Sequence, residues 1–104
     1  MGKKKEIDML TTFIADALRH RIGALLGLDK KYFRKYIFEY QERMNLAKKV
    51  IQKNHFNSYD ETIIKEKVIH KLNNELASRE YIDNKKFDIM DEEIEKALKE
   101  LELD

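Results

Sequence analysis

The most regular stretch of the chain spans residues 33–51 and reads FRKYIFEYQERMNLAKKVI. Its apolar residues recur at alternating steps of four and three, which places their side chains on one face of an α-helix. No proline or glycine interrupts the pattern. The spacing therefore predicts a long amphipathic helix over residues 30–54, with a core face made of Phe33, Ile37, Tyr40, Met44, Ala47 and Ile51.

Three further segments repeat this helical spacing before and after that stretch. They predict helices over residues 5–27, 60–79 and 84–103. The chain has no proline and only three glycines, whereas a sheet protein needs many turn residues. The expected core positions of these three helices are Ile7, Leu10, Ile14, Ala17, Leu18, Ile22, Leu25, Ile64, Val68, Leu72, Leu76, Phe87, Met90, Ile94, Ala97, Leu98 and Leu101.

Short connections make sequential amphipathic helices antiparallel neighbours. The 104 residues therefore predict a single domain over 1–104, an all-α up-down bundle of four helices with a short basic N-terminal tail at residues 1–5. A three-helix core with a detached C-terminal helix is the alternative, because the acidic last helix would also suit a partner. Asp29, Asp60 and Asp83 stand where the helical spacing begins, and we expect their side chains to cap the last three helices.

Several functional classes are excluded by composition. Cysteine is absent, which excludes disulfide frameworks, cysteine-bound metal centres and thiol nucleophiles. The longest stretches without a charge are seven residues, whereas a membrane-spanning helix needs about 20 apolar residues. Phosphate-binding glycine loops and the G-x-S-x-G motif of hydrolases are also missing. We expect a soluble, cytoplasmic protein with no cofactor, no membrane partner and no catalytic activity.

The charges of the chain are unevenly distributed. The formal net charge is only +1, but residues 1–55 hold 13 Lys and Arg against 6 Asp and Glu. Residues 56–104 hold 8 against 14, so the first half carries +7 and the second −6. The basic half therefore faces one of two partners, another molecule or the chain's own acidic last helix.

Basic and aromatic side chains alternate at the start of the second predicted helix. Lys and Arg neutralise phosphates and aromatic faces stack on unpaired bases, so this composition is typical of a nucleic-acid surface. Cations at the amino end of a helix also oppose its dipole, which indicates that they have a use. The alternative is an ordinary solvated helix face. The candidate nucleic-acid contacts are Lys30, Lys31, Tyr32, Arg34, Lys35 and Tyr36.

Two pairs of an acid and a histidine share a helix face at a spacing of four residues, Asp16 with His20 and Glu66 with His70. Such pairs are weak candidates for a metal site. The chain lacks the H-E-x-x-H motif of zinc enzymes and the Glu-x-x-His motif of di-iron bundles. Salt-bridged or surface histidines are the simpler interpretation.

His20 also has a place in a second hypothesis. Leu18, Arg19 and His20, followed by an apolar turn, a short loop and a second long helix, resemble the helical hairpin of a family of histidine phosphotransferases over about 35 residues. The resemblance implies a phosphoryl acceptor at His20, but Gly23 and Ala24 replace a polar residue of that family's motif. The alternative is an exposed histidine between two arginines.

Taken alone, the sequence favours a small non-catalytic interaction or assembly module. We expect it to bind a protein partner or to self-associate, for example as a homodimer, because several apolar side chains lie outside the helical stripes. Nucleic-acid binding at the start of the second helix is the alternative. A metal-dependent or phosphohistidine bundle is the third hypothesis.

Overall fold

The computed structural model describes residues 2–27 and 29–103. They form the four α-helices α1 (Gly2–Leu26), α2 (Phe33–Lys53), α3 (Ser58–Ala77) and α4 (Lys86–Glu100), with a short 3-10 helix, η1 (Lys30–Tyr32), before α2. The predicted all-α bundle is confirmed. No helix among the described residues has the length and apolar character needed to cross a membrane.

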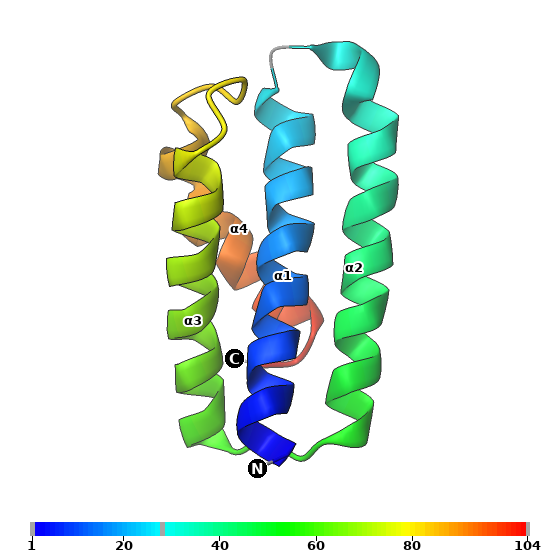
Figure 1. Cartoon of the computed structure of the whole chain (residues 1–104), viewed down its shortest axis with the longest axis vertical. Coiled ribbons are helices and arrows are strands. Elements are labelled where there is room, and N and C mark those ends of the chain that lie inside the picture. Colours follow the sequence, from blue (N-terminus) through cyan, green and yellow to red (C-terminus); the bar gives the residue numbers. More distant parts are fainter. Residues whose placement is uncertain (1, 28, 104) are drawn as a thin grey trace.

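Helix α1 lies at the centre of the molecule (Figure 1). Helices α2 and α3 lie on opposite sides of α1, where α2 runs antiparallel to it and α3 runs parallel to it, and α4 crosses behind at an angle. Helix α1 contacts each of the other three, and α4 also packs on α3. The result is an elongated body measuring 40 × 22 × 21 Å, in which α1 separates α2 from α3.

The C-terminal helix belongs to the core. Its inward face buries Met90, Ile94, Ala97 and Leu98 against α1 and α3. Burial of a large apolar side chain stabilises a fold by about 1.5–3 kcal/mol, so this face holds α4 firmly. The alternative of a three-helix core with a detached last helix is therefore wrong.

Most of the predicted core positions are buried, and the exceptions share a location. Leu25, Phe33 and Phe87 are 42%, 45% and 41% exposed. All three lie near helix ends at the end of the molecule that holds the α1–α2 and α3–α4 connections. Helical spacing identifies the face of a helix but not how far the neighbouring helices extend along it, so these three predictions are wrong.

Side-chain caps are present near the starts of the later helices, but not all of them are at the predicted residues. Asp29 caps η1 as predicted, because its carboxylate accepts a hydrogen bond from the Lys31 amide at 3.1 Å. Helix α3 is capped by Asn57, and Asp60 is its reciprocal partner in a capping box with bonds of 2.8 and 3.0 Å. Asp83 accepts from the Lys85 amide, but α4 begins only at Lys86 without a side-chain cap.

Helix α1 begins at Gly2, so the residues assigned to a basic tail at 1–5 lie in its first turns from Gly2 onward. Their position is fixed partly by Lys3, whose ammonium lies 2.9 Å from the Asp60 carboxylate of α3. Asp60 is buried, and the hydrogen bonds from Lys3 and the Asn57 amide lower its pKa. The basic N-terminal segment is thus part of the bundle.

The connection between α3 and α4 is fastened to the end of α1. The Asp83 amide donates to the Leu26 carbonyl at 3.1 Å, and Gly27 pairs with Ile82 in an isolated β-bridge. A Cβ atom on Gly27 would lie 2.3 Å from the Gly23 carbonyl oxygen, so a side chain there requires the backbone to shift. The hydrogen bond and the bridge hold the 78–85 segment where Tyr81 lines the same cleft as residues at the start of α2.

Candidate functional site

The basic segment comprises Lys30, Lys31, Arg34 and Lys35, in η1 and the first turn of α2, and all four side chains are exposed. Lys31 forms a long ion pair with Asp29, with 3.8 Å between Nζ and Oδ2. Lys30, Arg34 and Lys35 form no ion pair with any residue in the described ranges. The basic segment is therefore open to an external anion.

The acidic last helix does not cover the basic segment. Its carboxylates pair with cations elsewhere: Glu93 with Arg21, Glu95 with Lys65 and Glu100 with Lys48. The first turn of α2 also contains no acidic residue that would balance the cations near its amino end. Intramolecular neutralisation by α4, one of the two predicted outcomes, is not observed among the described residues.

Two tyrosines accompany these cations. The rings of Tyr32 and Tyr36 are stacked, with centroids 6.0 Å apart and planes 30° apart. Tyr32 is 40% exposed, and the Lys31 ammonium lies over its ring at 5.2 Å from the centroid. Tyr36 is half-buried and meets the His20 ring edge-on at 5.9 Å. The predicted aromatic and basic side chains are thus brought together.

A third tyrosine completes a cleft that the sequence did not reveal. The tyrosine cleft has a volume of about 480 Å³, and its lining residues are Gly27, Asp29, Tyr32, Lys35, Tyr36 and Tyr81. Tyr81 comes from the connection between α3 and α4, which the backbone hydrogen bond to Leu26 holds in place. Burial and the neighbouring Tyr81 raise the pKa of Tyr36.

An ionic network joins α1 to α2 and α3. Asp16 of α1 accepts from Arg19 Nη2 at 2.8 Å and from Arg43 Nε of α2 at 2.9 Å. Burial raises the pKa of Asp16, but the two guanidinium groups outweigh it and the net direction is downward. Arg19 Nε lies 3.4 Å from Glu75 Oε1 of α3 without forming a hydrogen bond. Burial raises the pKa of Glu75.

His20 is a buried member of this network. It is only 5% exposed, its Nδ1 lies 2.7 Å from the Asp16 carbonyl oxygen and its Nε2 lies 3.2 Å from Arg19 Nη2. Because the guanidinium can only donate, Nε2 accepts and Nδ1 carries the proton. Burial and the Arg19 charge lower the pKa of His20, although Asp16 and Glu39 act in the opposite direction. The expectation of an exposed histidine is wrong.

The surroundings of His20 and His70 bear on the phosphohistidine hypothesis and on the metal-site hypothesis. Both ring nitrogens are engaged within the fold, so a phosphoryl donor finds no accessible nucleophile there. Glu66 and His70 lie exposed on α3, where His70 Nε2 is 3.3 Å from the Asn74 amide nitrogen. Within residues 2–27 and 29–103, no three His, Asp or Glu side chains converge as a metal site requires.

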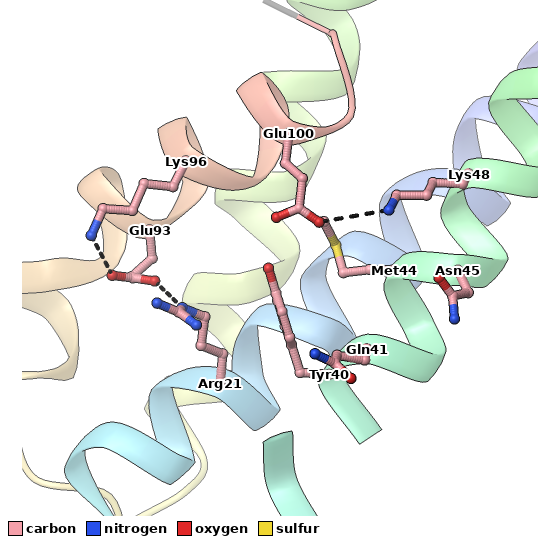
Figure 2. A pocket seen from close by; sticks show the side chains of 9 residues that line it. All are labelled: Arg21, Tyr40, Gln41, Met44, Asn45, Lys48, Glu93, Lys96 and Glu100. Carbon is pink, nitrogen blue, oxygen red and sulfur yellow. Dashed lines mark hydrogen bonds and ion pairs between the residues drawn. The ribbon is translucent and has the colours of Figure 1, made fainter. Parts of the chain in front are cut away.

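A second cavity of about 480 Å³ lies between α1, α2 and α4 (Figure 2). In this polar groove Glu93 is almost fully buried, 2.5 Å from Arg21 and 3.4 Å from Lys96. Lys48 reaches Glu100 at 3.8 Å, and the Tyr40 hydroxyl points toward the same carboxylate. Burial and Glu100 raise the pKa of Tyr40. The cations of this groove are neutralised by the chain itself.

Comparison of the chain with protein-family models, curated proteins and solved structures finds no match.

Proposed function

We propose that this chain is a small non-catalytic module that binds nucleic acid through the basic segment. The observation that carries the proposal is the juxtaposition of exposed cations, three without an ion pair in the described structure, with a stacked tyrosine pair. Lysine and arginine attract phosphates, and tyrosine faces stack on bases. The basic segment therefore combines the two chemistries that recognise a nucleic-acid strand.

The low net charge of the chain is compatible with this role. Attraction to a phosphate backbone depends on the local field within about a Debye length, roughly 8 Å at physiological salt. The acidic carboxylates of α4 that pair within the described fold do so with Arg21, Lys48, Lys65 and Lys96 rather than with the basic segment. The field near the start of α2 is thus positive although the whole molecule carries only +1.

Binding rather than catalysis is supported by the state of the titratable groups. All four buried ones among the described residues have partners in the fold, because His20 and Glu93 are engaged with arginines of α1, Asp60 pairs with Lys3 and Lys86 donates to the Arg79 carbonyl. A general base must be able to reach a substrate proton, and His20 lies beneath the Tyr36 ring with both nitrogens occupied. The exposed groups of the basic segment can supply contacts but no evident nucleophile.

The test is a fluorescence anisotropy titration of a labelled single-stranded oligonucleotide over a range of salt concentrations. Four phosphate contacts predict a slope of log affinity against log salt of about −3. The variant Lys30→Gln, Lys31→Gln, Arg34→Gln, Lys35→Gln removes these contacts. We expect it to lose most of the affinity at low salt and most of the slope.

A matched control removes four exposed cations from the opposite end of the bundle. The variant Lys4→Gln, Lys5→Gln, Lys49→Gln, Lys53→Gln changes the net charge equally, since these side chains are exposed at the start of α1 and in the second half of α2. It should retain nearly the parent slope. Equal losses in the two variants, or an affinity that does not fall with salt, would reject the proposal.

Self-association is a second candidate, favoured by exposed apolar side chains at the same end of the molecule. A two-fold symmetric contact at this end would bring two basic segments together, and their like charges would repel. The favourable contact is therefore head to tail, with the basic segment of one copy against the acidic face of α4 of a second copy. Light scattering at increasing concentration tests it, and a monomer at all concentrations would reject it. The exposed apolar residues near this end are Leu25, Tyr32, Phe33, Phe38, Tyr81 and Phe87.

A further inference from the structure

The tyrosine cleft has walls suited to a flat ring. Tyr32, Tyr36 and Tyr81 supply three aromatic side chains, and Gly27 leaves part of the wall without a side chain. Its volume of about 480 Å³ lies within the range of about 300–1,000 Å³ that is usual for small-molecule sites. The Lys31 ammonium lies over the Tyr32 ring, but Lys31 does not line the cleft and its side chain is 68% exposed.

The charges around the cleft favour an uncharged ring inside it and a phosphate group on the neighbouring cations. The Asp29 carboxylate lines the cleft, where it accepts from the Lys31 amide, and it would repel a phosphate placed inside. Lys30 and Arg34 lie outside the cleft lining, whereas Lys35 is an exposed residue of the lining. A neutral base in the cleft with its phosphates on these cations satisfies both sets of charges.

We propose that the tyrosine cleft binds an unpaired nucleobase, which stacks on the tyrosine rings that line it. This inference rests on the proposed nucleic-acid binding and specifies its substrate as single-stranded RNA or DNA. In a duplex each base is already stacked on its neighbours, so no base is available to enter the cleft. The exposed Lys31 ammonium lies beside the Tyr32 ring and can contact a phosphate of the same strand, so stacking and charge neutralisation act together.

Two further aromatic side chains near the start of α2 are exposed, outside the cleft lining. Phe33 is 45% exposed and Phe38 63% exposed, on the first two turns of α2. Base stacking on such faces is tolerant of sequence because every base has a π-face. The proposed site therefore distinguishes single strands from duplexes and discriminates only weakly between base sequences.

The experiment compares a single strand of about 12 nucleotides, a length within the site sizes of single-strand binders, with the same sequence in a hairpin duplex. The parent, Tyr32→Leu, Tyr32→Phe and Tyr81→Leu are titrated at one salt concentration. Tyr59→Leu is the matched control, since Tyr59 is a tyrosine 73% exposed at the other end of the bundle. Tyr36 is left unchanged because it packs against Gly23.

We expect Tyr32→Leu to weaken single-strand binding about ten-fold, in line with the usual value of one stacked base, without changing duplex binding. Tyr32→Phe keeps the ring and should bind as the parent does, and so should Tyr59→Leu. The chain has no tryptophan, and three of its five tyrosines line the cleft. Single-strand binding should therefore quench tyrosine emission, and Tyr32→Leu should reduce that quenching.

The outcomes separate this inference from the proposed function. If the Gln variants of the basic segment lose salt-dependent binding while Tyr32→Leu and Tyr81→Leu both retain full single-strand affinity, the base-binding cleft is wrong and the proposed function stands. Equal parental affinity for the single strand and the duplex also overturns the cleft. If the parent binds neither form, both proposals are overturned.

Discussion

The tyrosine cleft and the polar groove have the same volume, about 480 Å³, and both border α2. Each contains tyrosine and cationic side chains, but their charges are arranged differently. In the polar groove Arg21 and Lys48 pair with glutamates of α4 (Figure 2). In the basic segment three of the four cations have no ion pair within the described chain. The groove's charges hold helices together, whereas those of the segment are available to a ligand.

The largest expected effect on stability is at Arg21, in the polar groove. Replacing it in Arg21→Met leaves the buried Glu93 carboxylate with only the longer contact to Lys96. Breaking a buried ion pair usually costs 3–5 kcal/mol, and the remaining lysine lowers the expected loss of unfolding free energy to about 3 kcal/mol. Urea unfolding followed by circular dichroism measures it.

The control for this prediction lies in the basic segment. Lys35→Met removes a cation that has no ion pair in the described structure, so its unfolding free energy should remain within about 0.5 kcal/mol of the parent. If Lys35→Met destabilises the fold as much as Arg21→Met does, the cations of the basic segment are structural. The distinction between the two regions would then be lost.

The second effect concerns the backbone that shapes the cleft. A methyl group on Gly27 would lie 2.3 Å from the Gly23 carbonyl oxygen, so Gly27→Ala forces the end of α1 to move. We expect a loss of about 2 kcal/mol, which is typical of overpacking, together with weaker single-strand binding. Gly2→Ala is the matched control, since nothing lies within 4 Å of its added carbon. Equal stability of the two variants in thermal unfolding would contradict the described approach of the two glycines.

A third, smaller effect has the opposite sign. Arg34 stands in the first turn of α2, where a cation opposes the helix dipole and no acidic residue compensates. Arg34→Glu should therefore stabilise the fold by about 0.5 kcal/mol while it weakens oligonucleotide binding. Lys53→Glu, in the last turn of the same helix, should destabilise by a similar amount and leave binding nearly unchanged. Thermal unfolding and anisotropy measure the two properties, and a destabilised Arg34→Glu variant would contradict this account.

The sequence predicted the fold well where each helix has neighbours along its length. Leu72 and Leu76 of α3 are fully buried, as their spacing indicated. The same spacing failed for Phe33 and Phe87, because a periodic pattern contains no information about where a neighbouring helix stops. The predicted core face of α2 is only half-buried at Ile37, since α1 is the main helix that covers α2.

The candidate site was predicted in part. Alternation of basic and aromatic residues located the exposed Lys30 and its neighbours, since composition and position at a helix start are local properties. Tyr81 was missed because it reaches the cleft through the hydrogen bond between Leu26 and Asp83, a contact between distant segments that leaves no pattern in the sequence. The burial of His20 was missed for the same reason, since Glu39 of the neighbouring helix helps to enclose it.

The smallest predicted effect tests whether the ionic network beneath the cleft is independent of binding. The pKa of His20 in the fold lies below its ordinary value of 6.5, chiefly because of burial, so the neutral ring is the form that the fold favours. Its contribution to stability is present above pH 6.5 and is lost as the pH falls through and below that value. Between pH 7 and 5 the parent's unfolding free energy should decrease.

In His20→Asn the amide can donate to the Asp16 carbonyl as Nδ1 does, but it does not titrate. Asp16 and Glu39 carboxylates and the Arg19 guanidinium still surround the position. The variant is expected to be less stable at pH 7, because the edge contact with Tyr36 is lost, yet to show a smaller decrease toward pH 5. Urea unfolding at several pH values measures both.

An unchanged pH dependence would mean that His20 already carries its charge in the fold, paired with Glu39. An altered salt slope of oligonucleotide binding in this variant would show that the network and the basic segment act together, because no charge of the segment itself has been changed.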